Sequence, residues 1–316
     1  MANHRGFLLF LLVIWLLLLT SCIRDDLSDC PPESNKVQIN FTYDTPYGPR
    51  TFEKGELKIA HLYIFNDKGE YINTLTYHSP ELYKTYTLDI DLLPGKYEFI
   101  VWFNKDEFFD VRSSDSNEII GNPFNHADIL HLVVPEEGYI ATPLPLILYG
   151  DVDEKEITGS GHQLVSIPLE QNTNTINVTV KGLPKTGNSY FQVITDRNSN
   201  ETFRNEPARG TDFHYVAPMS RKAATDLTSS LRVLKLYQEN QPKFILWNET
   251  EKKELYPGNS GLPNNLIGLI LERYPDVDFR TTHIFDIILT YDTSMNVSVD
   301  VRYWNDMETD YEIEPD

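Results

Sequence analysis

Cysteine is scarce in this chain of 316 residues, which contains only Cys22 and Cys30. A scaffold of several disulfides and a zinc site built from cysteines are therefore excluded, so burial of apolar side chains must stabilise the fold. For Cys30 we predict a free buried thiol, because an unpaired cysteine behaves as a small apolar side chain. The alternative is that Cys30 forms a disulfide with another chain.

Positive charge is also scarce. The chain has 27 Lys and Arg against 47 Asp and Glu, which gives a formal net charge of −20. Arg5 is the one charged residue among residues 1–21, so removal of that segment would change the charge from −20 to −21. Such a surface repels phosphate backbones, and the sequence therefore excludes nucleic acid as a partner.

Catalytic motifs are missing as well. The sequence contains no H-E-x-x-H, no G-x-S-x-G, no phosphate-binding P-loop and no glycine-rich dinucleotide turn. We therefore predict that the protein is not an enzyme and that it uses no cofactor. Carboxylate pairs are numerous, but glycoside hydrolysis requires a defined spatial separation that proximity in sequence does not give, so it stays the least supported alternative.

One acidic cluster has ligands that would suit calcium. The cluster consists of Asp151, Asp153, Glu154 and Glu156. Lys155 stands where a further ligand would be expected, so we predict a solvated acidic loop and no metal site. His61 lies on the apolar face of a predicted strand, and we interpret it as a hydrogen-bonded core residue rather than a metal ligand.

The one long apolar run lies at the start of the chain. It extends from Phe7 to Leu19, follows His4 and Arg5, and is shorter than the roughly 20 residues that a membrane-spanning helix needs. A cationic start, an apolar stretch and a cleavage site with small residues define a secretory signal. We therefore predict that residues 1–21 are a signal peptide.

The cleavage site indicates the type of signal. Leu19-Thr20-Ser21-Cys22 resembles the lipobox of bacterial lipoproteins, so Cys22 is predicted to become the lipidated first residue of the tether 22–34. The alternative is an ordinary buried or disulfide-bonded cysteine. Several acyl chains, at about 0.8 kcal/mol per buried CH₂, hold a protein durably on a membrane without a spanning helix.

The residues after Cys22 predict where in the cell the protein is located. Arg24-Asp25-Asp26 resembles the surface-export signal of Bacteroidales lipoproteins, which indicates the outer membrane, with the protein exposed on the cell surface. The alternative is a solvated tether whose charges have no role.

Short segments that alternate apolar and polar residues fill most of the remaining chain, as is typical of half-buried strands. The predicted strands lie at 37–43, 57–65, 71–72, 97–103, 144–149, 165–169, 176–180, 190–194, 231–237, 243–247, 285–291 and 297–303. At about 100 to 200 residues per domain, this length predicts two domains. We expect a mostly β fold of two tandem β-sandwiches, an N-terminal domain 35–170 and a C-terminal domain 171–316, with the boundary near Gln171–Asn174.

Turn residues and one helical pattern complete this outline. Hairpins are predicted at Asn66–Gly69 and at Pro94-Gly95, and an irregular excursion with at most short helices at Asn104–Leu132. Pro168 predicts an edge position for its strand, because proline donates no ladder hydrogen bond. The helical pattern is formed by Leu262, Leu266, Leu269 and Ile270, with Pro263 in the first turn.

The C-terminal residues predict a strand that can pair with another chain. The candidate partner-strand residues are Val297, Val299, Val301, Tyr303, Met307, Thr309, Tyr311 and Ile313. From Met307 onward these residues alternate with acidic ones, which would keep a free strand from aggregating. Such a segment could add to an open sheet edge of a partner. For this tail, from Met307 to Ile313, the equally weighted alternative is an edge strand folded onto its own domain.

The order of several of these features resembles the FimB-type fimbrillin-associated anchor lipoprotein family of Bacteroidales type V pili. The segments that carry the resemblance are Cys22–Pro32, Tyr43-Asp44, Leu62–Gly69 and Val301–Trp304. The resemblance implies two transthyretin-like domains and a non-enzymatic minor subunit at the base of the fimbrium. Its implied partners are the major fimbrial shaft subunit and, through the lipid anchor, the outer membrane. It also implies an influence on pilus length.

The resemblance further implies a mechanism. Shaft subunits of this kind are thought to polymerise when the C-terminal strand of one subunit fills a groove in the N-terminal domain of the next. An anchor whose N-terminus is fixed in lipid would contribute one such interface, and we assign it to the region from Val297 to Ile313. The acidic Trp304-Asn305-Asp306 segment departs from what a strand buried in a partner would carry.

Two other functions remain open. A surface glycan-binding lipoprotein would hold sugars on exposed aromatic rings, with Trp102, Trp247 and Trp304 as candidates, although strand aromatics are more often core residues. A pilus tip adhesin would differ from an anchor in its position along the shaft.

Overall fold

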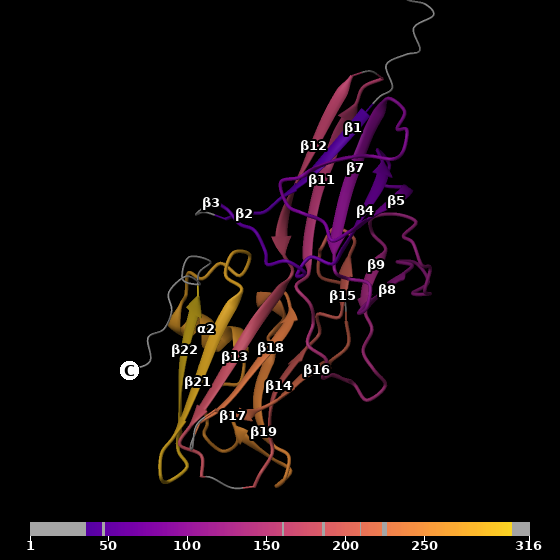
Figure 1. Cartoon of the computed structure of the whole chain (residues 1–316). Coiled ribbons are helices and arrows are strands. Elements are labelled where there is room, and N and C mark those ends of the chain that lie inside the picture. Colours follow the sequence, from indigo (N-terminus) through magenta and orange to yellow (C-terminus); the bar gives the residue numbers. More distant parts are fainter. Residues whose placement is uncertain are drawn as a thin grey trace, which may run out of the picture.

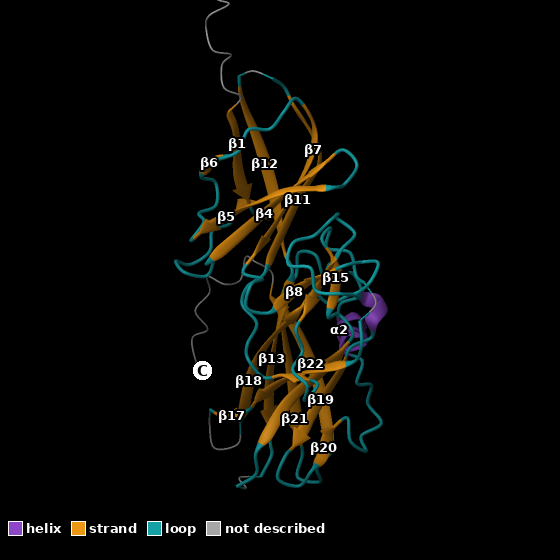
Figure 2. Cartoon of the chain, turned by 90° about the vertical axis from the view of Figure 1, so that its right-hand side faces the viewer, coloured by secondary structure: helices purple, strands orange, loops and turns teal. Residues whose placement is uncertain are grey.

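The computed structural model describes residues 36–45, 48–159, 161–184, 187–208, 210–222 and 226–304. Strands form most of this part of the chain, so the predicted mostly β fold is confirmed (Figure 2). Cys22, Cys30, the predicted signal peptide and the stretch from Met307 to Ile313 lie outside the described residues. Within them, no helix has the length and apolar character needed to cross a membrane.

Seven strands of the N-terminal half form one sheet in the order β5-β4-β7-β11-β12-β1-β6. These strands are β1 (Lys36–Thr42), β4 (Ile59–Asn66), β5 (Tyr71–His78), β6 (Thr85–Thr87), β7 (Gly95–Phe103), β11 (Leu148–Ile157) and β12 (His162–Gln171). The short strands β2 (Asp44–Thr45) and β3 (Gly48–Pro49) form a separate pair. Buried side chains of β1 and β12 share one hydrophobic cluster with those of β4 and β7, so the sheet folds over on itself. We call this unit the first sandwich.

The alternation of buried and more exposed side chains shows where the core of the first sandwich lies. Val37, Ile39 and Phe41 of β1 are buried while their neighbours are not, as the sequence predicts. The Phe41 ring meets Phe103 of β7 edge to face at 5.3 Å, which joins the two layers. The Asn66–Gly69 turn joins β4 to β5 as predicted, with Gly69 at a positive φ of 75°.

Two five-stranded sheets form the C-terminal half, in the orders β10-β16-β14-β19-β20 and β17-β18-β13-β21-β22. Their strands are β10 (Tyr139–Ile140), β13 (Thr173–Lys181), β14 (Tyr190–Asp196), β16 (Phe213–Pro218), β17 (Ser220–Arg221), β18 (Leu227–Leu234), β19 (Lys243–Asn248), β20 (Lys253–Tyr256), β21 (Ile284–Tyr291) and β22 (Val297–Trp304). Buried residues of both sheets share a second cluster. We call this unit the second sandwich.

Helix α2 (Leu266–Arg273) packs on the second sandwich, and its buried residues join that cluster (Figure 2). The helix begins later than predicted, because Asn265 caps it by accepting a hydrogen bond from the Gly268 N–H at 3.0 Å. Pro263 precedes the helix, and its carbonyl accepts a hydrogen bond from the Tyr256 hydroxyl. A short 3₁₀ turn, η2, covers Gln238–Asn240.

The prediction that β12 is an edge strand is wrong, because it lies between β11 and β1. Pro168 is accommodated where the ladders end: it pairs with Thr42, the last residue of β1, and the β11 ladder begins at Leu169. Gly150 of β11 lies close to it, since a Cβ at Gly150 would stand 2.5 Å from the Pro168 carbonyl oxygen. Proline therefore sits inside the sheet only where no ladder bond is required of it.

Three other local predictions are corrected. Pro94-Gly95 leads into β7 but closes no hairpin, because β6 pairs with β1 and β7 pairs with β4 and β11. The Asn104–Leu132 excursion holds strands rather than helices, namely β8 (Phe109–Arg112) and β9 (Ile129–Leu132). The acidic cluster around Asp151 lies in strand β11 rather than in a loop, with a register shift between Val152 and Lys155. In the described ranges, no group of three or more potential ligands could hold a metal ion.

The two sandwiches meet end to end where β12 passes into β13 (Figure 1). Only Asn172 separates these strands, and it is fully buried. A small sheet in the order β15-β9-β8 lies beside the crossing, with β9 from before β12 and β15 (Asn200–Thr202) from after β13. The predicted division at Gln171–Asn174 thus coincides with the change of sheet, although the extent of each domain stays a prediction.

Residues next to β15 fasten the junction. The Trp102 indole N–H donates to the Phe203 carbonyl at 3.2 Å, and the Phe203 ring meets Tyr63 of β4 edge to face at 4.9 Å. Arg204 donates to the buried Glu98 of β7 at 2.7 Å. The loop after β15 is therefore held by apolar and charged contacts to the first sandwich.

Glu201 is a buried carboxyl group at the centre of the junction. It accepts hydrogen bonds from the Asn172 amide at 2.8 Å and from the Tyr237 hydroxyl at 3.1 Å. Complete burial raises the pKa of Glu201 to about 7, because desolvation disfavours its charged form more than these two donors favour it. The folded protein therefore binds a proton at Glu201 more tightly than the unfolded chain does.

We predict that Glu201→Gln makes the protein more stable relative to wild type as pH rises. The raised pKa costs wild-type stability between about pH 4.5 and 7, by up to about 3 kcal/mol, whereas Gln preserves the neutral hydrogen-bonding pattern without titrating. Urea unfolding of both proteins at pH 5 and pH 8 measures the difference, and the comparison cancels the contributions of the other titrating groups, which both proteins share. Glu206→Gln, at an exposed position, is the matched control. Parallel pH profiles for wild type and Glu201→Gln would contradict the prediction.

Candidate partner-binding edge

Strand β22 is an edge strand of the second sandwich. It pairs antiparallel with β21 along its whole length, from Tyr291↔Val297 to Ile284↔Trp304. In the part of the chain that the structure describes, β21 is its one neighbour in the sheet. The other side of β22 therefore presents a row of backbone groups that could pair with an added strand.

The hairpin before β22 fixes which backbone groups face outward. The Asp292 N–H donates to the Asn296 carbonyl at 2.9 Å, and Met295 takes a positive φ of 64° in the turn. The Asn296 side-chain amide donates to the Asp292 carboxylate and holds the pKa of that carboxyl below its usual range. Because antiparallel pairs alternate between bonded and non-bonded, the odd-numbered residues 297–303 direct their N–H and C=O groups away from β21.

Side chains of β22 also alternate. Val301 is buried and Val297, Val299 and Tyr303 are half-buried, so these four predicted partner-strand residues share one face of the strand. The opposite face is exposed, and on it Arg302 bonds Asp300 at 3.2 Å. The stretch Val297–Trp304 is thus a strand of its own sheet, which does not decide between the two alternatives left open for the tail from Met307 to Ile313. The remaining four predicted residues, from Met307 to Ile313, lie outside the described chain.

An aromatic pair fixes the end of β22. The Tyr303 ring meets Tyr274, which follows helix α2, edge to face with centroids 4.5 Å apart and an interplanar angle of 87°. Both rings pack against the second hydrophobic cluster. The free edge therefore rests on a buried support and has a defined position.

Strand directions place this edge far from the start of the described chain. β1 runs parallel to β12, with Lys36 opposite His162, so the chain enters at the end of the first sandwich that is remote from the junction. β12 and β13 then run in succession through both sandwiches (Figure 1). Their ten and nine residues span about 60 Å at roughly 3.3 Å per residue.

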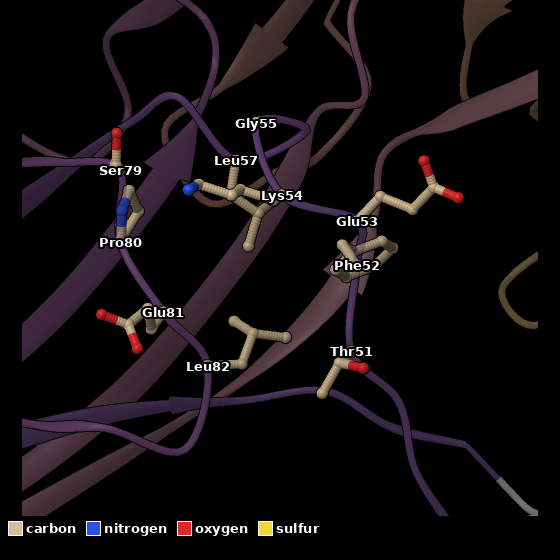
Figure 3. A pocket seen from close by; sticks show the side chains of 10 residues that line it. All are labelled: Thr51, Phe52, Glu53, Lys54, Gly55, Leu57, Ser79, Pro80, Glu81 and Leu82. Carbon is tan, nitrogen blue, oxygen red and sulfur yellow. The ribbon is translucent and has the colours of Figure 1, made fainter.

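A hollow of about 540 Å³ lies at the base of the first sandwich, between residues 51–57 and 79–82 (Figure 3). Phe52, Leu57 and Leu82 supply its apolar lining, while the Glu53 carboxylate points away from it. Loops rather than strands form both walls. The hollow thus lacks the aligned backbone groups that strand addition requires.

The three tryptophans proposed as a sugar platform have separate surroundings. Trp102 is completely buried, so it is a core residue and that proposal is wrong for it. Trp247 is half-buried on the outer face of β19, where it lines a second hollow with Phe191 and His214. The side chain of Trp304 is outside the described part. Sequence reasoning missed the second hollow, although the nearly continuous apolar run from Tyr190 to Ile194 is a signal that both faces of β14 are apolar.

Comparisons with known proteins agree with this architecture. The family model of the fimbrillin-A associated anchor proteins Mfa1 and Mfa2 matches residues 27–307. The fimbrial anchor protein Mfa2 from Porphyromonas gingivalis has a similar fold, with a TM-score of 0.68 and 16% identity over 85% of this chain and 98% of that one. No curated protein matches the sequence.

Two further solved structures share the fold. A candidate adhesin from Bacteroides thetaiotaomicron has a TM-score of 0.67 and 15% identity over 87% of this chain and 98% of its own. A candidate adhesin from Bacteroides ovatus has a TM-score of 0.66 and 16% identity over 88% of this chain and 100% of its own. At these identities the likeness supports the fold.

We predict that Tyr303→Leu loosens β22 without unfolding the protein. The substitution keeps an apolar side chain but removes an edge-to-face pair worth about 1 kcal/mol. Guanidinium unfolding should show this loss, and amide hydrogen exchange should accelerate in β22 more than in β12. Tyr303→Phe keeps both rings and is the matched control. Equal exchange in the Leu and Phe variants would contradict a role of the ring pair.

Proposed function

Because the chain belongs to the family of fimbrillin-A associated anchor proteins, we propose that it is a lipid-anchored subunit of the outer membrane that attaches a fimbrial shaft to the cell surface. The family indicates a structural role rather than a catalytic one. In this proposal the partner is the first shaft subunit, and the anchor also limits pilus length. The lipid is carried by Cys22, at the start of a tether that leads to β1.

The observation that carries the proposal is the free edge of β22. Its outward backbone groups lie on the second sandwich, whereas β1 begins at the remote end of the first. One end of the molecule is thus available for the membrane and another surface for the polymer. A strand from the shaft subunit would pair with β22, and main-chain hydrogen bonds would provide much of the affinity.

The exposed face of β22 supports use of the edge in assembly rather than in aggregation. Ser298, Asp300 and Arg302 put polar and charged groups there, which limits unspecific pairing between edges. An added strand would instead direct alternate apolar side chains toward the half-buried Val297 and Val299. The predicted segment from Met307 to Ile313 would extend the same contact.

We predict that Val299→Pro detaches pili from cells while the protein stays folded. Proline removes one outward N–H from the free edge and leaves the β21 ladder intact, since it is tolerated at edge positions. Electron microscopy with immunogold labelling measures cell-bound and shed pili, and also distinguishes the base from the tip. Val299→Ala keeps the N–H and is the matched control. Pili that stay attached in Val299→Pro cells would exclude pairing at this position.

Removal of Met307 to Asp316 tests the predicted extension of the contact. We expect more shed pili, with thermal unfolding of the protein unchanged, because the deletion leaves β22 in place. If shedding equals that of wild type, the contact is confined to the described strand.

We predict that Cys22→Ser abolishes lipidation. The variant should take up no radiolabelled palmitate and should leave the membrane fraction, because a serine hydroxyl cannot form the lipid thioether. Cys30→Ser is the matched control and should be labelled like wild type. A membrane-bound, unlabelled Cys22→Ser protein would show that another element anchors the chain.

A further inference from the structure

The outer face of the sheet β10-β16-β14-β19-β20 is apolar at its centre. In cross-strand order, Phe191 of β14 stands beside Trp247 of β19, and Val193 stands between Ile245 and Val216. All five side chains are half-buried and line a hollow of about 660 Å³. This volume lies within the roughly 300–1,000 Å³ typical of small-ligand sites.

Aromatic side chains stand at two edges of this hollow. The Trp247 indole N–H donates to Glu249 at 2.8 Å, which fixes the ring in the hollow. Tyr139, with 43% of its surface exposed, stands at the opposite edge. Aromatic side chains therefore border the hollow on two sides.

Hydrogen-bonding groups stand at its rim. Glu254, opposite Trp247 in the β19-β20 ladder, is exposed, and within the described ranges its side chain forms no ion pair or hydrogen bond. His214 uses Nδ1 in a hydrogen bond of 2.8 Å with Thr195 Oγ1, which leaves its other ring nitrogen for a ligand. The hollow therefore combines an apolar floor with at least two polar groups at opposite edges.

The backbone of the floor decides between classes of ligand. β14 is paired on both sides, by β16 and by β19, so its N–H and C=O groups are already used in ladders. An extended peptide lying on this floor would leave some of its own backbone groups without partners, which is costly. A sugar ring has apolar C–H faces for the aromatic side chains and hydroxyl groups only at its periphery, where Glu254 and His214 stand.

The negative charge around the hollow limits the class of sugar that can bind there. Glu249 is paired with Lys252, but Glu254 adds an uncompensated negative charge in a chain whose net charge is −20. Uronic acids and sulfated or phosphorylated sugars would be repelled. We propose that this hollow binds a neutral hexose unit of a glycan, with Trp247 as the stacking residue and Glu254 and His214 as hydrogen-bonding residues. The site lies on the sheet opposite to β22 and is independent of the anchor function.

The test is a screen of the full chain on an array of neutral, amino and acidic oligosaccharides, followed by titration of tryptophan fluorescence with the bound neutral glycan. We expect Trp247→Ala to weaken binding by about tenfold or more and Glu254→Gln to weaken it several-fold. Glu254→Gln changes an exposed side chain to one of nearly the same shape, so the variant should fold like wild type. Phe124→Ala, which truncates an aromatic side chain 65% exposed elsewhere, is the matched control and should bind like wild type.

Four outcomes would overturn the proposal. These are no binding to any neutral glycan, binding to acidic glycans alone, equal affinity of the wild type and both hollow variants, and a dimer in sedimentation that Trp247→Ala dissociates. The last result would assign the face to a second copy of the chain. Pilus attachment measured in the same Trp247→Ala cells should be normal, which separates this site from the β22 edge.

Discussion

The buried polar crossing between the two sandwiches is the constraint on which the rest of the structure depends. Asn172, Thr173 and Asn174 are fully buried, so their polar groups can find partners only inside the protein. Within the described residues, the amide nitrogens of Asn172 and Asn174 each donate a hydrogen bond, whereas Asn172 Oδ1 and Thr173 Oγ1 have no partner. The Asn174 side chain accepts from the Leu236 N–H at 2.9 Å and donates to the Thr282 carbonyl at 3.2 Å, which ties β13 to the residues that follow β18 and to those that precede β21. Since β21 positions β22, this crossing also sets where the free edge lies.

Much of the fold follows from alternation, and the crossing shows where that reasoning ends. Strands such as β1, β21 and β22 were predictable, because each buries one apolar face. The polar sequence Gln171–Asn174 was recognised as a boundary, but its burial was not predictable: partners such as Glu201 are brought to it by the fold, from positions far along the chain. The interior place of Pro168 likewise depends on where two ladders end, which is a property of the sheet and not of the residue.

The residues of the candidate edge were predictable, but the place of their strand in the sheet was not. Val297, Val299, Val301 and Tyr303 were identified from their period of two, and they do share one face. That β22 lies at the edge of its sheet depends on strand order, which periodicity does not contain. The outer hollow around Trp247 was missed because the sequence pattern gives one apolar face to each strand, whereas β14 and β19 have two.

These surfaces can coexist because they use different parts of the same sandwich. The edge of β22 offers backbone groups and belongs to one sheet, and the hollow offers side chains and belongs to the other. A strand added at β22 would extend its sheet sideways and would leave the outer face of the opposite sheet uncovered. Attachment of a polymer at the edge and binding of a second ligand in the hollow would therefore make no competing demand on any residue.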